Sequence, residues 1–138
     1  MIADPQHFER LQLERGLNYH GYYAIGLAAS LKEMLMLLEY GDRGFDFVLI
    51  NAQLVKHTRF DLISYCLENN FLRQAFIYGV AKYQLMRLKP ETKKRLILSS
   101  AQYPDIYQLG HLLKNLSSET KSLDWILQEN QTNTARNT

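Results

Sequence analysis

The chain has 138 residues, of which 46% are hydrophobic and 22% charged, a size and composition typical of one globular domain. Sixteen Lys and Arg residues against fourteen Asp and Glu residues give a formal net charge of +2, too small to favour nucleic acid or an anionic membrane as partner of the whole surface. The single cysteine, Cys66, excludes an internal disulfide, and the absence of any membrane-spanning run or signal sequence leads us to expect a cytoplasmic protein.

The first predicted elements are a very short strand and a helix. Only Met1 to Ala3 precede Asp4, so little chain is available for a first strand. Asp4 followed by Pro5 predicts a helix start, because the carboxylate can accept free backbone N–H groups as N-cap and proline has no N–H to satisfy. The helix is expected to run to about Gly16, with an inner side formed by Phe8, Leu11 and Leu17.

The next elements are a strand and a well-defined helix. The apolar run Tyr22–Ala28 predicts a strand. Ser30 begins the sequence Ser-Leu-Lys-Glu, a capping box in which the side chains of Ser30 and Glu33 each accept the backbone N–H of the other residue. Gly41 is expected to end this helix. The inner side of this helix should be formed by Leu31, Met34, Leu35 and Leu38.

The second half of the chain repeats this alternation. Strands are predicted at Phe45–Ile50, Ala75–Tyr78 and Leu96–Leu98. Helices are predicted at Arg59–Asn69, at Tyr83–Leu88 with an interruption by Pro90, and at Asp105–Leu116. The strands are apolar throughout and do not alternate with polar residues, so each should be covered on both faces.

Together these elements predict an α/β fold: a doubly wound, five-stranded parallel sheet with helices on both faces and a short first strand. The domain is expected to cover residues 1–116. Residues 117–138 should form a C-terminal extension or linker, largely disordered after about residue 127, because from Gln128 to Thr138 only Ala135 is apolar.

The residues that follow the strands are the candidates for function, since ligands of such sheets bind beyond the carboxyl ends of the strands. These residues are Asp4, Pro5, Asn51, Gly79, Ser99 and Ser100.

Three stretches suggest a family. They are I-A-D-P-Q-H-F-E-R-L from Ile2, G-Y-Y-A-I-G-L-A-A-S-L-K-E-M-L from Gly21, and F-D-F-V-L-I-N-A from Phe45 with R-F-D-L-I after it. In these stretches the chain resembles the receiver domain of two-component response regulators, which has a flavodoxin-like fold. The resemblance spans about residues 1–116 and implies a module of signal transduction.

The chain departs from the receiver pattern at the site that accepts phosphate. The family's phosphoacceptor aspartate is matched by Asn51, whose neutral amide is a poor nucleophile. Its acidic pair is matched by Asp4 and Pro5, too few carboxylates for Mg²⁺. Its hydroxyl is matched by Gly79, and its lysine falls within 99–101. We therefore expect a degenerate receiver, a pseudo-receiver that is not an enzyme and uses no metal or other cofactor.

The resemblance also implies a contact surface on the fourth helix, fifth strand and fifth helix. Its candidate residues are Tyr83, Met86, Arg87, Leu96, Tyr107 and His111. The expected partner is a second copy of the chain in a homodimer, another protein, or an output domain that is attached or separate. The stretch Lys82–Arg95 holds six basic residues and one acidic residue, and is either a solvated surface or a docking site for an anionic partner.

Two other hypotheses stay open. One is a ligand-sensing module that holds a small molecule or anion in the crevice around Asp4, Asn51 and Gly79. The other is a small enzyme of the same fold, although no pair of nucleophile and base can be assembled from the sequence. Cys66 in particular is predicted to lie in the middle of a helix as a small buried hydrophobic residue.

Overall fold

The computed structural model of the chain describes residues 1–40, 44–69, 72–89, 95–107, 109–111 and 113–114. The chain divides into two compact units, Met1–Pro104 and Asp105–Thr138. The first unit contains the sheet. In the second, the described residues are helical from Ile106 onward, and the Asp105 carboxylate accepts the backbone N–H of Tyr107 at 2.9 Å.

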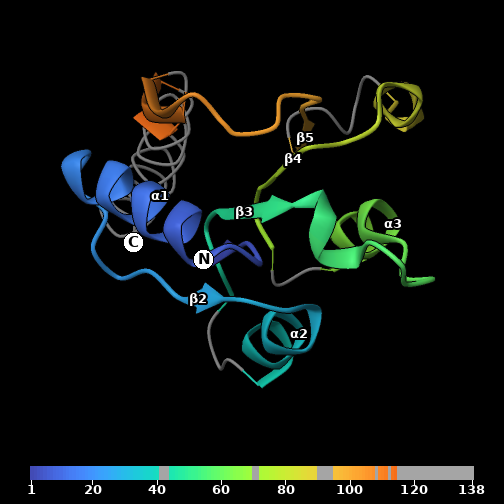
Figure 1. Cartoon of the computed structure of the whole chain (residues 1–138), viewed down its shortest axis with the longest axis horizontal. Helices are drawn as coiled ribbons and strands as arrows, with labels where there is room; N and C mark the ends of the chain where they lie inside the picture. The colour runs from blue at the N-terminus through green and yellow to red at the C-terminus, as the bar shows by residue number, and fades with distance from the viewer. Residues whose placement is uncertain (41–43, 70–71, 90–94, 108, 112, 115–138) are drawn as a thin grey trace, which may run out of the picture. The chain divides into compact units, whose positions relative to one another are not determined.

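The first unit is built on a five-stranded, all-parallel sheet with the strand order β2-β1-β3-β4-β5 (Figure 1). The strands are β1 (Ile2–Ala3), β2 (Leu27–Ala28), β3 (Val48–Asn51), β4 (Ala75–Tyr78) and β5 (Leu96–Leu98). This arrangement confirms the predicted α/β fold, in which the chain winds first to one side of β1 and then to the other.

The first strand has only two residues, yet it lies inside the sheet. Its neighbours bond it on both sides: the Ile2 N–H donates to the Gly26 carbonyl at 2.8 Å, and the Leu49 N–H donates to the Met1 carbonyl at 2.9 Å. Ile2 and Ala3 are fully buried. A short strand suffices here because it hydrogen-bonds to a neighbouring strand on each side.

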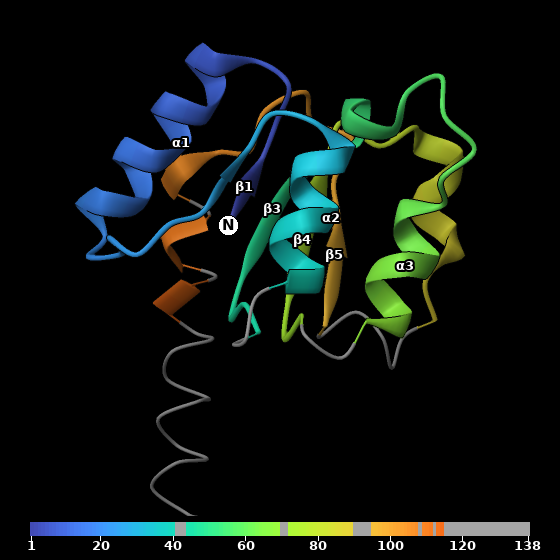
Figure 2. The same cartoon turned by 90° about the horizontal axis from the view of Figure 1, so that it is seen from below.

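Helices cover both faces of the sheet, as predicted. Figure 2 shows α1 (His7–Tyr19) on one face and α2 (Leu31–Tyr40) with α3 (Leu62–Glu68) on the other. The remaining elements of this unit are the 3₁₀-helices η1 (Ala52–Val55) and η2 (Lys82–Arg87). The main core includes Ala3, Ala28, Met34, Leu38, Val48, Ile50, Ile63, Cys66, Ile77 and Leu96. No helix among the described residues is long and apolar enough to cross a bilayer.

The first helix differs from the prediction at its start, its end and its inner side. It begins at His7 with Gln6 as N-cap and runs three residues past Gly16 to Tyr19, so Asp4 does not cap it. Phe8 is 65% exposed, whereas Leu13 and Leu17 are buried. Phe8 and Leu17 are nine residues apart, about two and a half helical turns, and therefore lie on opposite faces.

Two predicted strands also have different bounds. Residues 22–26 are irregular and only Leu27–Ala28 pair with β1, because β1, the one neighbour of this edge strand, itself has only two residues. The strand predicted to begin at Phe45 begins at Val48 and extends to Asn51, while Phe45 forms an isolated bridge to Leu72.

The capping box before α2 is confirmed. The Glu33 N–H donates to the Ser30 hydroxyl at 3.2 Å, and the Glu33 carboxylate accepts the Ala29 N–H at 2.6 Å. The hydrogen bond to the Glu33 carboxylate therefore comes from Ala29, one residue before Ser30. The predicted helix end at Gly41, the break at Pro90 and the extension 117–138 lie outside the described residues.

The element predicted from Tyr83 is the 3₁₀-helix η2, and an ion pair holds it against the start of α3. The helix α3 begins at Leu62, three residues after the predicted start at Arg59. Its N-cap is Asp61, whose carboxylate accepts the Ser64 N–H at 3.2 Å. Arg87 donates to both oxygens of Asp61, at 3.2 and 2.8 Å. The Arg87 guanidinium lowers the pKa of Asp61 from 3.8 to about 2.

This contact predicts a loss of stability in acid. The folded pKa of Asp61 lies below its unfolded value, so its contribution is complete above pH 3.8 and disappears as the pH falls toward about 2. Urea midpoints should therefore separate the wild type from Arg87→Gln at pH 6 and converge near pH 2. Arg73→Gln, which breaks an exposed ion pair to Asp46, should show little effect at any pH. A constant difference between wild type and Arg87→Gln across this range would contradict the assignment.

Candidate functional site

A cluster of three buried polar side chains lies at the carboxyl ends of the central strands. Asp4 directly follows β1, Asn51 is the last residue of β3, and Tyr78 is the last residue of β4. Asn51 and Tyr78 are register partners. Asp4 and Tyr78 are 0% exposed and Asn51 is 5% exposed, so the cluster is closed to solvent.

The Asp4 carboxylate is the centre of this cluster. Its Oδ2 accepts hydrogen bonds from the Tyr78 hydroxyl and from Nδ2 of Asn51, the latter at 3.1 Å, and its Oδ1 accepts the Gln6 N–H at 2.8 Å. Three donors compensate the burial of a charged group. Burial and the hydrogen bond to Asp4 raise the pKa of Tyr78, so its hydroxyl stays protonated and remains a donor.

Asn51 uses both ends of its amide. While Nδ2 donates to Asp4, Oδ1 accepts the Gln53 N–H at 2.9 Å and caps η1. The amide therefore joins the carboxylate on β1 to the backbone after β3. A side chain committed in this way has no free oxygen directed at a ligand.

Gly79 closes the cluster beside Asn51. Its φ of +70° is a conformation that favours glycine, and a Cβ atom there would lie 3.3 Å from Oδ1 of Asn51. Its N–H donates to the Ala101 carbonyl at 2.8 Å. The backbone after β4 therefore lies directly against Asn51, where a side chain would crowd the cluster.

The structure brings only part of the predicted strand-end site together. Asp4, Asn51 and Gly79 lie next to one another. Ser99 follows β5, where its hydroxyl accepts the Ala101 N–H at 3.2 Å, while Pro5 and Ser100 are exposed. Cys66, the one cysteine, is buried in α3, and burial raises the pKa of its thiol to about 12. In the described part of the chain, no three His, Cys, Asp or Glu side chains are grouped to hold a metal.

Tyr78 and Gln6 supply two of the three donors to Asp4, and neither was among the predicted site residues. The signal for Tyr78 was present: it ends a predicted strand, next to the glycine that was selected. The cluster could not be predicted without the register between β3 and β4, which places Tyr78 beside Asn51.

The residues predicted for a contact surface fall into different environments. Tyr83 is 78% and Met86 90% exposed on η2, beside Arg87, which binds Asp61. Leu96 is 1% exposed in β5, so its inclusion in the surface is corrected: the side chain belongs to the core. Tyr107 and His111 are exposed residues of the second unit.

Arg87 and Arg95, at the middle and the end of the basic stretch Lys82–Arg95, have structural roles. Arg87 binds Asp61, and Arg95 donates to the carbonyl oxygens of Leu67, at 3.1 Å, and Asn69. Both arginines therefore hold the ends of α3. Lys93 and Lys94 lie outside the described residues.

Comparison of the chain with models of known protein families, with curated protein sequences and with solved structures found no match.

The cluster predicts that the Tyr78 hydroxyl stabilises the fold. Tyr78→Phe should lower the free energy of unfolding by about 1–3 kcal/mol, because it leaves a buried carboxylate without one of its donors. Urea denaturation measures the change. Tyr103→Phe is the matched control, since its exposed hydroxyl lies 3.3 Å from Oε1 of Gln6, and should change stability by less than about 0.5 kcal/mol. Equal small effects of the two variants would contradict the cluster.

Proposed function

We propose that this chain is a receiver-like signalling module that is not phosphorylated and that acts through contacts with another protein or with a second copy of itself. The observation that supports this proposal best is the closed state of the Asp4 carboxylate. It is fully buried and accepts three hydrogen bonds from protein donors. No phosphoryl group or cation could reach it without displacing them.

The chemistry of phosphoryl acceptance supports the same proposal. An acceptor of this kind needs an anionic oxygen as nucleophile and a divalent cation held by several carboxylates. The end of β3 offers Asn51, a neutral amide with both atoms bonded, and the end of β1 offers Asp4 followed by Pro5. The residues that would perform the reaction are here parts of a structural cluster.

The exposed side chains of η2 support a role in protein contacts. Tyr83 and Met86 present large apolar groups to solvent, and residues of these types are enriched at protein interfaces. The ion pair between Arg87 and Asp61 holds η2 in place, so the apolar groups are displayed on an ordered segment. In this proposal the partner is a second copy of the chain or an output domain, attached or separate.

The alternative, a ligand in the crevice around Asp4, Asn51 and Gly79, is less well supported. The oxygens of Asp4 and the amide atoms of Asn51 are already bonded to neighbours. The close approach of Gly79 to Asn51 leaves little space beside them.

The first test is phosphorylation. Incubation with acetyl phosphate and Mg²⁺ should leave the mass of the intact protein unchanged, and beryllofluoride with Mg²⁺ should leave its melting temperature unchanged, because Asn51 is not an acceptor and Asp4 is closed. A receiver that retains its aspartate is the positive control. An increase in mass by one phosphoryl group, mapped to any aspartate of residues 1–116, would disprove the proposal.

The second test concerns self-association through η2. Light scattering of the wild type should show a dimer at high protein concentration, and Met86→Glu should weaken it by about fivefold or more, because a charge would enter an apolar contact. Met36→Glu, a matched change of an exposed methionine on α2, should leave the dimer intact. A strict monomer, or equal effects of the two substitutions, would contradict a homodimer formed through this surface.

A further inference from the structure

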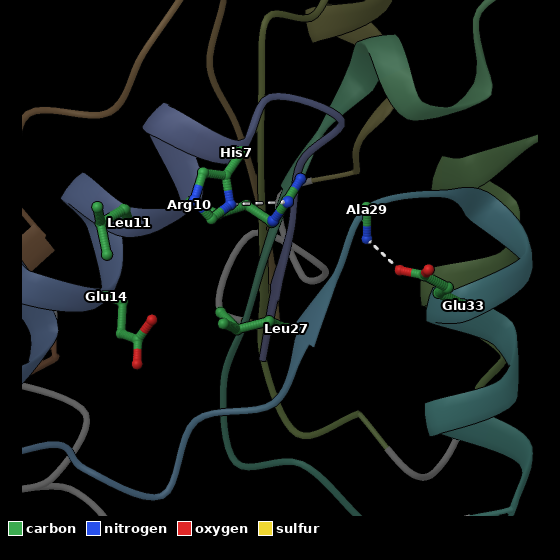
Figure 3. Close-up of a pocket in the computed structure, with 7 residues that line it drawn as sticks. All are labelled: His7, Arg10, Leu11, Glu14, Leu27, Ala29 and Glu33. Carbon is green, nitrogen blue, oxygen red and sulfur yellow. Dashed lines mark hydrogen bonds between the residues drawn. The ribbon is translucent and has the colours of Figure 1, made fainter.

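A cleft of about 250 Å³ opens between the first turns of α1, the strand β2 and the start of α2 (Figure 3). It is separate from the buried cluster around Asp4. Side chains of two kinds line it. Leu11 and Leu27 are apolar, whereas His7, Arg10, Glu14 and Glu33 are polar or charged.

Arg10 is held in a fixed position in this cleft without a carboxylate partner. Its NH1 donates to the Asp4 carbonyl at 2.7 Å, and its NH2 lies 3.4 Å from Nδ1 of His7. Arg10 and Glu14 are four residues apart on α1, a spacing at which opposite charges often pair. Here the bond to Asp4 draws the guanidinium away, and no carboxylate of the described residues lies within ion-pair distance of it.

The acidic side of the cleft is supplied by Glu14. Glu33 is committed to the start of α2, where its carboxylate accepts the Ala29 N–H at 2.6 Å. The side chain of Glu14 forms no hydrogen bond or ion pair with any residue that the structure describes. In Figure 3 its side chain lies on the α1 wall of the cleft, across from Leu27 of β2.

The cleft therefore offers a positive group and a negative group, neither neutralised by the other, beside an apolar surface. One helical turn separates Arg10 from Glu14, about 6 Å along the axis. We infer that the cleft binds a small zwitterion whose acidic group and ammonium group are separated by an apolar chain. The acidic group binds Arg10, the ammonium binds Glu14, and the chain contacts Leu11 and Leu27. This inference does not depend on the proposed function.

The test uses three probes of equal chain length on the full chain. Isothermal titration compares 6-aminohexanoate, which has both charges, with hexanoate and hexylamine, which each have one. We expect the zwitterion to bind about tenfold more tightly than either analogue, because each charged contact adds to binding. Leucine, whose ammonium and carboxylate groups are attached to the same carbon atom, should bind more weakly than 6-aminohexanoate.

Two variants identify the contacts. Glu14→Gln should reduce the affinity for 6-aminohexanoate to that of hexanoate, and Arg10→Gln should reduce it to that of hexylamine. Glu14→Gln is the deciding variant, because it removes no side-chain hydrogen bond or ion pair to the described residues and should leave the fold intact. Arg15→Gln and Glu39→Gln, changes of exposed charges outside the cleft, are the controls and should leave binding unchanged.

Three results would overturn the inference. One is no binding of 6-aminohexanoate up to millimolar concentration. Another is equal affinity for the zwitterion and for a single-charge analogue, which would indicate a simple anion or cation site. The third is binding that Glu14→Gln leaves unchanged. Phosphorylation of the chain would disprove the proposed function but not this inference, because the phosphorylation test concerns Asp4 and Asn51 and not the cleft.

Discussion

The burial of one carboxylate organises the carboxyl end of this sheet. A buried charge is tolerated only with hydrogen-bond donors around it, and those of Asp4 come from the turn after β1, from β3 and from β4. The cluster thus connects the three inner strands at the edge where the chain reverses its winding. Because β1 has only two residues, these bonds supplement a backbone ladder that is short there.

The same commitment determines what this edge of the sheet can do. In a doubly wound sheet the position between β1 and β3 is where the connections diverge and a ligand usually enters. Here the side chains of Asp4 and Asn51 bond to each other across it. The oxygen atoms of Asp4 and Asn51 that would face a ligand at this position already accept hydrogen bonds from protein donors.

The sequence predicted the elements whose signals are local. β4 and β5 match their predicted ranges, and the bonds of Ser30 and Glu33 form as a capping box. The rule for strand ends also selected Asp4, Asn51 and Gly79. The errors arose where distant contacts decide: β2 pairs only with the two residues of β1, and Leu96 is buried by its neighbours. Tyr78 was missed because its role depends on the register between β3 and β4.

Asp4 also connects the buried cluster with the cleft. Its carboxylate belongs to the buried cluster, and its carbonyl accepts the hydrogen bond that positions Arg10 in the cleft. A ligand that moved the Arg10 guanidinium would thus act on the backbone of Asp4. The Asp4 carboxylate accepts three hydrogen bonds whose distances and angles tolerate little movement. Such a ligand can bias the fold only if it binds two arrangements of Asp4 with different affinity. Arg10 is therefore the residue through which occupancy of the cleft would reach the centre of the sheet.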